Sequence, residues 1–136
     1  GFAHYAVKAG NPAYVYNFRY IADALRGRDK GVGHGGEIVY VFGLHGLSQT
    51  PRGAMLTSFA TDKDKSVVAL MQNYWANFAK TGDPNGNAQP QWPMSSDARP
   101  VTLVVDDMTK AVPDYRKNQL SVIYMGWAAR TGNPEP

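Results

Sequence analysis

The sequence predicts an α/β chain that holds only part of a fold. Residues 62–80 carry apolar side chains at helical spacing, which predicts a long amphipathic helix. Residues 13–20 and 101–105 are rich in β-branched and aromatic residues, which predicts two strands. Because two or three short strands offer little surface for the apolar helix faces, we expect the rest of the sheet to come from residues outside this sequence.

Length and composition narrow the class of protein. A chain of 136 residues with 43% hydrophobic content is of ordinary single-domain size. We expect no membrane-spanning segment, because no run of 18 apolar residues occurs. We expect no nucleic-acid partner, because the charge of +3 comes from dispersed basic residues. The first residues lack the pattern of a signal peptide, and the composition leaves the compartment of the protein open.

Metals and cofactors are not expected either. The absence of cysteine excludes disulfides, thiol nucleophiles and thiolate metal sites. No set of histidine, aspartate and glutamate has the spacing of metal ligands. His4 has no partner by spacing, and we interpret His45 as a loop histidine.

The N-terminal third alternates short elements and loops. Residues 1–9 are expected to end a helix, and residues 10–12 form a turn signal. In the strand predicted at 13–20, a period of two places alternate aromatic residues on one face, which we interpret as packing. These residues are Tyr14, Tyr16, Phe18 and Tyr20. Residues 22–33 are polar and contain glycine, which predicts a loop.

One histidine stands in a glycine-rich setting, GVGHGGEIVYVFG at residues 31–43. Glycine permits positive φ, so His34 is expected on a tight, exposed turn where other groups can approach the imidazole. Histidine titrates near neutrality, which suits a general base. On pattern alone, however, a glycine-rich surface loop with an incidental histidine is the favoured interpretation.

The run that follows is ambiguous between helix and strand. Val39, Tyr40 and Val41 favour a strand by composition. Glu37 suits a helix N-terminus, where its negative charge meets the positive end of the helix dipole. Residues 44–60 then show no periodicity, which predicts a long connection.

The helix predicted at 62–80 has clear ends. Asp62, Asp64 or Ser66 is expected to cap its N-terminus, and Gly82 is expected to end it with a left-handed residue. Its apolar face is interpreted as core and comprises Val67, Leu70, Met71, Tyr74, Trp75 and Phe78.

The C-terminal segment predicts a strand and a helix. After the Asp83–Gly86 turn, Trp92 is expected to pin an irregular stretch to the body of the protein. The strand at 101–105 turns at Asp106 and Asp107 and is expected to return through residues 110–112. Pro113 suits the first position of a final helix. The apolar stripe of that helix comprises Leu120, Ile123, Tyr124 and Trp127.

Four segments in order resemble one known family. They are GNPAYVYNF at 10–18, the histidine stretch at 31–43, YWANFAKTGDPN at 74–85 and WP at 92–93. In this order the chain resembles the C-terminal portion of type-B carboxylesterases, the cholinesterase-like branch of the α/β-hydrolases. The resemblance implies that residues 1–136 form the C-terminal part of a single α/β-hydrolase domain, with the last sheet strands and their packing helices. It also implies a short helix at 37–43.

The resemblance assigns roles to two residues. It implies that His34 is the histidine of a Ser-His-acid triad in a serine carboxylesterase, which hydrolyses esters through an acyl-enzyme. Glu37 matches the glutamate that follows this histidine in the family, a supporting group and not the triad acid.

The sequence lacks the other parts of such a site. No G-x-S-x-G is present, the oxyanion-hole segment and the triad acid are missing, and Asp106 and Asp107 come too late in the chain to replace the acid. We therefore expect two partners: the N-terminal part of the same hydrolase, which supplies these groups, and a small-molecule ester substrate. The isolated chain is expected to be inactive.

A second hypothesis comes from another class of protein. Some cholinesterase-like domains are non-catalytic adhesion or interaction domains. A serine at the upstream nucleophile elbow indicates an enzyme, whereas glycine or alanine there indicates a binding domain.

Overall fold

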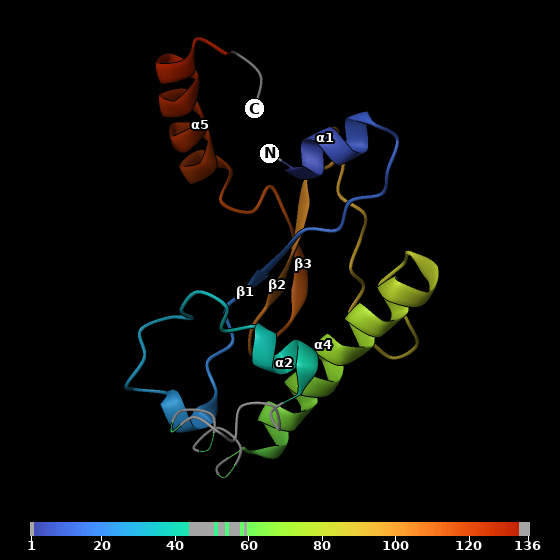
Figure 1. Ribbon diagram of the computed structural model, residues 1–136, viewed down its shortest axis with the longest axis vertical. Coiled ribbons are helices and arrows are strands. Elements are labelled where there is room, and N and C mark those ends of the chain that lie inside the picture. The colour runs from blue at the N-terminus through green and yellow to red at the C-terminus, as the bar shows by residue number, and fades with distance from the viewer. Residues whose placement is uncertain (1, 44–50, 52–53, 55–57, 59, 134–136) are drawn as a thin grey trace. The chain divides into compact units, whose positions relative to one another are not determined.

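The computed structural model describes residues 2–43, 51, 54, 58 and 60–133 (Figure 1). Its helices and strands are, in order, α1 (Phe2–Lys8), β1 (Tyr16–Phe18), the 3-10 helix η1 (Asp23–Leu25), α2 (Ile38–Phe42), α4 (Asp62–Thr81), β2 (Val101–Val105), β3 (Lys110–Pro113) and α5 (Lys117–Thr131). The chain forms two compact units. The first comprises residues 1–17, 92–104 and 110–136, and the second comprises 18–91 and 105–109.

Most of a three-stranded sheet, in the order β1-β2-β3, belongs to the first unit. β2 and β3 form an antiparallel hairpin whose register pairs Val101 with Pro113 and Val104 with Lys110. Next to β1, the Leu103 N–H donates to the Val15 carbonyl at 2.8 Å. The strand at 101–105 and the return strand are confirmed. The strand expected at 13–20 exists but is shorter.

Trp92 fastens an irregular segment to this unit. Its side chain is buried, and its indole N–H donates to the Val15 carbonyl at 3.1 Å. Its ring meets Tyr14 and Tyr16 edge-on, at centroid distances of 6.1 and 5.8 Å. The interpretation of Trp92 as an anchor is confirmed.

The final helix differs from expectation. Pro113 ends β3, so its assignment as the first helical residue is wrong. Asp114 and Arg116 follow with positive φ, and this turn delays α5 until Lys117. No residue of α5 is buried within the described structure, and Leu120 and Ile123 from its apolar stripe are 56% and 67% exposed.

The second unit contains the long helix α4. Its N-cap is Thr61, not one of the three residues expected. Asp64 serves as the partner of Thr61 in a capping box. Gly82 ends the helix at φ +77°, and its N–H donates to the Phe78 carbonyl, so this expectation is confirmed. Of the predicted apolar face, Val67, Met71 and Tyr74 are buried, whereas Phe78 is about half exposed.

The connection expected at 44–60 lies largely outside the described residues. Pro51, Ala54 and Ser58 within it have helical backbone. Among the helices that the structure describes, none has the length and apolar composition to cross a membrane.

Candidate functional site

His34 lies on a tight turn in the second unit. The Gly36 N–H donates to the Gly33 carbonyl at 3.0 Å, which makes His34 and Gly35 the two central residues of the turn. Gly35 has a φ of +70°, and His34 is not among the residues with positive φ. A glycine with positive φ at the third position is what a type II turn requires. The predicted tight, exposed turn is confirmed.

Gly36 is required for a different reason. A β-carbon at this position would stand 2.5 Å from Val32 Cγ1 and 3.1 Å from the Gly33 carbonyl oxygen. A β-carbon at Gly31 or Gly33 would meet nothing within 4 Å. Two of the four flanking glycines therefore set the shape of the turn, and the other two are not sterically required.

The turn leads directly into α2. The Ile38 N–H donates to the Gly35 carbonyl at 3.1 Å, and the Tyr40 N–H donates to the Glu37 carbonyl at 2.9 Å. Glu37 is the N-cap residue and is half-buried. The short helix implied by the resemblance is confirmed, against the β-branched composition of the segment. Tertiary packing decides the outcome, because a five-residue helix has little stability of its own.

The packing that makes Ile38–Phe42 a helix centres on Tyr40. This side chain is 4% exposed, and its ring lies 4.9 Å from that of Phe18 and 5.7 Å from that of Tyr20. α2 also lies against α4, as Figure 1 shows. The turn that carries His34 is thus attached to a packed aromatic cluster.

The imidazole of His34 is open to approach. The residue is exposed, and within the described part of the chain neither His34 nor Glu37 has a side-chain hydrogen bond or ion pair. An exposed imidazole can accept a proton from a nucleophile brought close to it. Among the described residues, no hydrogen bond or ion pair joins the side chain of His34 to a serine or a carboxylate.

The buried carboxylate of Asp64 lies next to the aromatic cluster around Tyr40. Asp64, 2% exposed, accepts hydrogen bonds from the Tyr20 hydroxyl at 2.7 Å and from the Thr61 N–H at 2.8 Å. Burial opposes ionisation of Asp64, but the hydrogen bonds from Thr61, Tyr20 and Asp23 outweigh it and hold the pKa of Asp64 below its usual value. Burial and the adjacent Asp64 carboxylate raise the pKa of Tyr20.

Asp107 belongs to a surface ion-pair cluster. The Arg26 guanidinium donates to both Asp107 oxygens, at 2.9 and 2.5 Å, and its Nε donates to Asp23 at 2.8 Å. Lys63 Nζ lies 2.7 Å from Asp107. The hydrogen bonds from Arg26 and Lys63 lower the pKa of Asp107 to about 2. Asp107 is therefore engaged by cations, in agreement with its exclusion as a triad acid.

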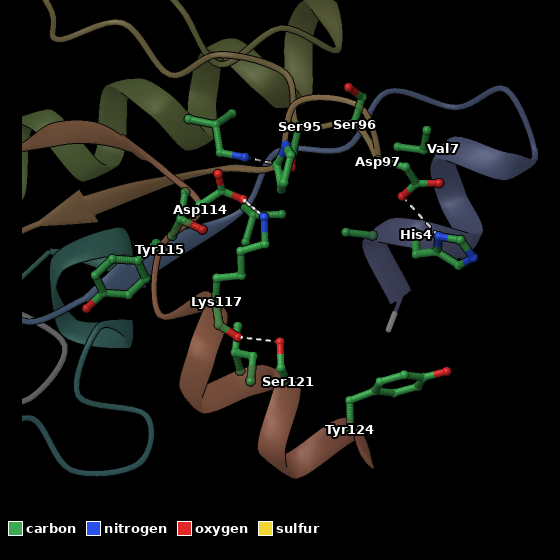
Figure 2. A pocket seen from close by; sticks show the side chains of 16 residues that line it. His4, Val7, Ser95, Ser96, Asp97, Asp114, Tyr115, Lys117, Ser121 and Tyr124 are labelled. Carbon is green, nitrogen blue, oxygen red and sulfur yellow. Dashed lines mark hydrogen bonds and ion pairs between the residues drawn. The ribbon is translucent and has the colours of Figure 1, made fainter. Parts of the chain in front are cut away.

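Sequence reasoning missed a pocket in the first unit (Figure 2). A cavity of about 480 Å³ lies between α1, α5 and the segment that includes Ser95 and Ser96. On its wall, His4 Nδ1 lies 2.9 Å from Asp97 Oδ1. Figure 2 shows the second ring nitrogen of His4 directed away from both serines, so the pair does not complete a hydrolytic triad. No sequence signal could find this pair, because 93 residues separate its members.

His45 lies outside the described residues. In the ranges that the structure describes, no three histidine, aspartate or glutamate side chains gather as metal ligands would.

Comparison with known proteins places the chain in a family. The model of the carboxylesterase family matches residues 1–123. Carboxylesterase 4A of Bos taurus is 40% identical over 93 residues, which are 67% of this chain and 15% of that protein. Liver carboxylesterase 1 of Oryctolagus cuniculus is 30% identical over 129 residues, which are 93% of this chain and 21% of that protein. The chain thus spans about a fifth or less of these relatives.

Solved structures agree in fold. An esterase from Clostridium hathewayi, described as hydrolysing aliphatic aromatic polyesters, has a TM-score of 0.69 at 22% identity over 88% of this chain and 22% of its own. A PNB esterase has a TM-score of 0.69 at 26% identity over 85% of this chain and 22% of its own. These neighbours have the α/β-hydrolase fold, and the small sheet with its helices is consistent with part of it. The match of the family model to residues 1–123 shows that the chain belongs to the carboxylesterase family.

Proposed function

We propose that this chain supplies the general base of a serine carboxylesterase. The observation that carries the proposal is His34, exposed on a turn that Gly35 and Gly36 shape, in a chain of the carboxylesterase family. In this role His34 takes the proton of a serine hydroxyl as the serine attacks an ester carbonyl. It returns that proton to the leaving alcohol, and then takes a proton from the water that hydrolyses the acyl-enzyme. This chemistry needs no cofactor.

Glu37 is proposed to support this base. It caps α2 three residues after His34, and its backbone carbonyl accepts the first hydrogen bonds of that helix. Glu37 is not proposed as the triad acid.

The remaining groups are proposed to come from the N-terminal part of the same hydrolase. That part would supply the serine, the triad acid and the oxyanion hole, and residues 1–136 would form the C-terminal part of one α/β-hydrolase domain. Two observations support this proposal. The sequence has no G-x-S-x-G, and four large apolar side chains of α5 are exposed. The substrate would be a small-molecule carboxylic ester.

The test is His34→Ala in the complete enzyme. Loss of the general base should lower kcat by about 10⁴-fold or more, because the serine then lacks a proton acceptor. His4→Ala is the matched control, since it removes a histidine that is paired with Asp97 in the first unit. A His34→Ala enzyme with wild-type kcat would refute the proposal.

A second measurement concerns the isolated chain. It should not hydrolyse a chromogenic ester, because a base without an oxyanion hole cannot stabilise the tetrahedral intermediate. Saturable hydrolysis by the purified 136-residue chain would show that it holds its own nucleophile.

A further inference from the structure

Tyr20 joins the N-terminus of α4 to the helix that follows His34. Its hydroxyl donates to Asp64 at 2.7 Å, and its ring meets the Tyr40 ring at 5.7 Å and 83°, an edge-to-face contact. Tyr20 is 2% exposed, and the Arg26 guanidinium lies 5.4 Å from its ring centre. One end of this chain of contacts is therefore a buried hydrogen bond, and the other end is α2.

The position of α2 depends on Tyr40. Tyr40 is the residue of this five-residue helix that is buried, and it packs against Phe18 and Tyr20. A helix this short is held by its packing, not by its own hydrogen bonds. Because the Ile38 N–H is bonded to the Gly35 carbonyl, a movement of α2 moves the turn that carries His34.

The hydroxyl of Tyr20, and not its ring alone, makes the contact specific. Edge-to-face aromatic pairs are favourable over centroid distances of about 4.5–7 Å, so ring packing alone lets Tyr20 slide against Tyr40. A hydrogen bond of 2.7 Å allows a much narrower range of positions. Its acceptor is itself held, because Asp64 also accepts from the backbone N–H groups of Thr61 and Asp23.

We propose that Tyr20, through its hydrogen bond to Asp64, is a positioning residue that fixes α2 and thereby the orientation of His34. The inference rests on the proposed role of His34 as the general base. The pKa of Asp64 is lowered by its hydrogen bonds, and that of Tyr20 is raised by burial and by the adjacent carboxylate, so both shifts favour a neutral phenol that donates to a carboxylate.

Tyr20→Phe in the complete enzyme tests the proposal, with Tyr74→Phe as the matched control. Tyr74 is also fully buried, and its hydroxyl donates to the Pro90 carbonyl at 2.5 Å. Both variants therefore lose one hydrogen bond of a buried tyrosine and keep the ring. Tyr20→Phe should lower kcat about tenfold with KM changed less than about twofold, because displacement of a catalytic group lowers the rate of the chemical step. Tyr74→Phe should leave kcat within about twofold.

A spectroscopic measurement separates positioning from general destabilisation. The imidazole NMR signals of His34 should shift in Tyr20→Phe and stay in place in Tyr74→Phe. Equal losses of kcat in the two variants, or an unchanged kcat in Tyr20→Phe, would overturn the proposal. If Tyr20→Phe does not accumulate, Asp64→Asn weakens the same acceptor with little change in side-chain shape and is expected to lower kcat in the same way.

The outcomes also distinguish this inference from the proposed function. An active His34→Ala enzyme refutes the role of His34 itself. An inactive His34→Ala enzyme together with a fully active Tyr20→Phe enzyme refutes only the positioning role of Tyr20.

Discussion

Replacement of Gly36 by alanine tests whether the shape of the turn controls His34. The new β-carbon would stand 2.5 Å from Val32 Cγ1 and 3.1 Å from the Gly33 carbonyl oxygen. Carbon atoms in contact prefer separations of about 3.5 Å, so Val32 and the turn must together yield by about 1 Å. Overpacking of this kind costs about 1–3 kcal/mol, and a 1 Å misplacement of a catalytic group lowers the rate about 100-fold. We expect Gly36→Ala to lower the kcat of the complete esterase by about that factor.

The same turn provides two controls. Gly33→Ala should keep near-normal kcat, because its β-carbon meets nothing within 4 Å. Adding Val32→Ala to Gly36→Ala should restore part of the activity, because it removes the nearer of the two clashing atoms. Initial rates with a chromogenic ester measure all three variants. Equal kcat values for Gly36→Ala and Gly33→Ala would refute the steric argument.

Two further predictions concern stability. Thr61→Ala should lower the free energy of unfolding by about 1 kcal/mol, because α4 loses its N-cap. Thr61→Ser should leave the free energy of unfolding nearly unchanged, because serine keeps the capping hydroxyl. Equal melting temperatures for Thr61→Ala and Thr61→Ser would contradict the capping role. The folded-state pKa of Asp107 is lowered from 3.8 to about 2, so its ion pairs stabilise the fold above about pH 4 and that stability is lost as the pH falls toward about 2. Asp107→Asn should reduce this acid dependence by less than about 1 kcal/mol, because the pairs are half exposed. If urea unfolding of the wild-type protein and of Asp107→Asn has the same pH dependence, the Asp107 ion pairs do not contribute to acid stability.

Elements with strong local signals could be predicted from the sequence. The end of α4 at Gly82 follows from a residue that adopts positive φ, and β2 follows from a run of β-branched residues. Pro113 was assigned wrongly because a proline suits both a first helical position and the end of an edge strand. Its pairing opposite Val101 decides between the two, and that pairing is not a local property.

The candidate site also contains some features that the sequence predicts and others that it does not. The turn around His34 could be predicted, since Gly35 supplies its positive φ from the adjacent position. The partners of Asp64 could not. The sequence predicts Asp64 as a helix cap. In the structure its carboxylate also accepts a hydrogen bond from Tyr20, which lies 44 residues earlier. The Tyr40 packing that makes α2 a helix also joins residues from separate segments, so local propensity points to a strand there.

The exposed face of α5 bears on whether the 136 residues form a complete core. Four of its large apolar side chains are 56–70% exposed, namely Leu120, Val122, Ile123 and Met125. Full burial of such a side chain is worth about 1.5–3 kcal/mol, so these four forgo roughly 1–2 kcal/mol each. The sum, about 4–8 kcal/mol, is comparable with the total stability of a small domain. Contiguous apolar side chains exposed on one helix indicate a surface that another part of the protein covers. We therefore expect amide hydrogen exchange in α5 to be slow in the complete esterase and fast in the isolated chain. Equal protection in both would show that this face needs no other part of the hydrolase.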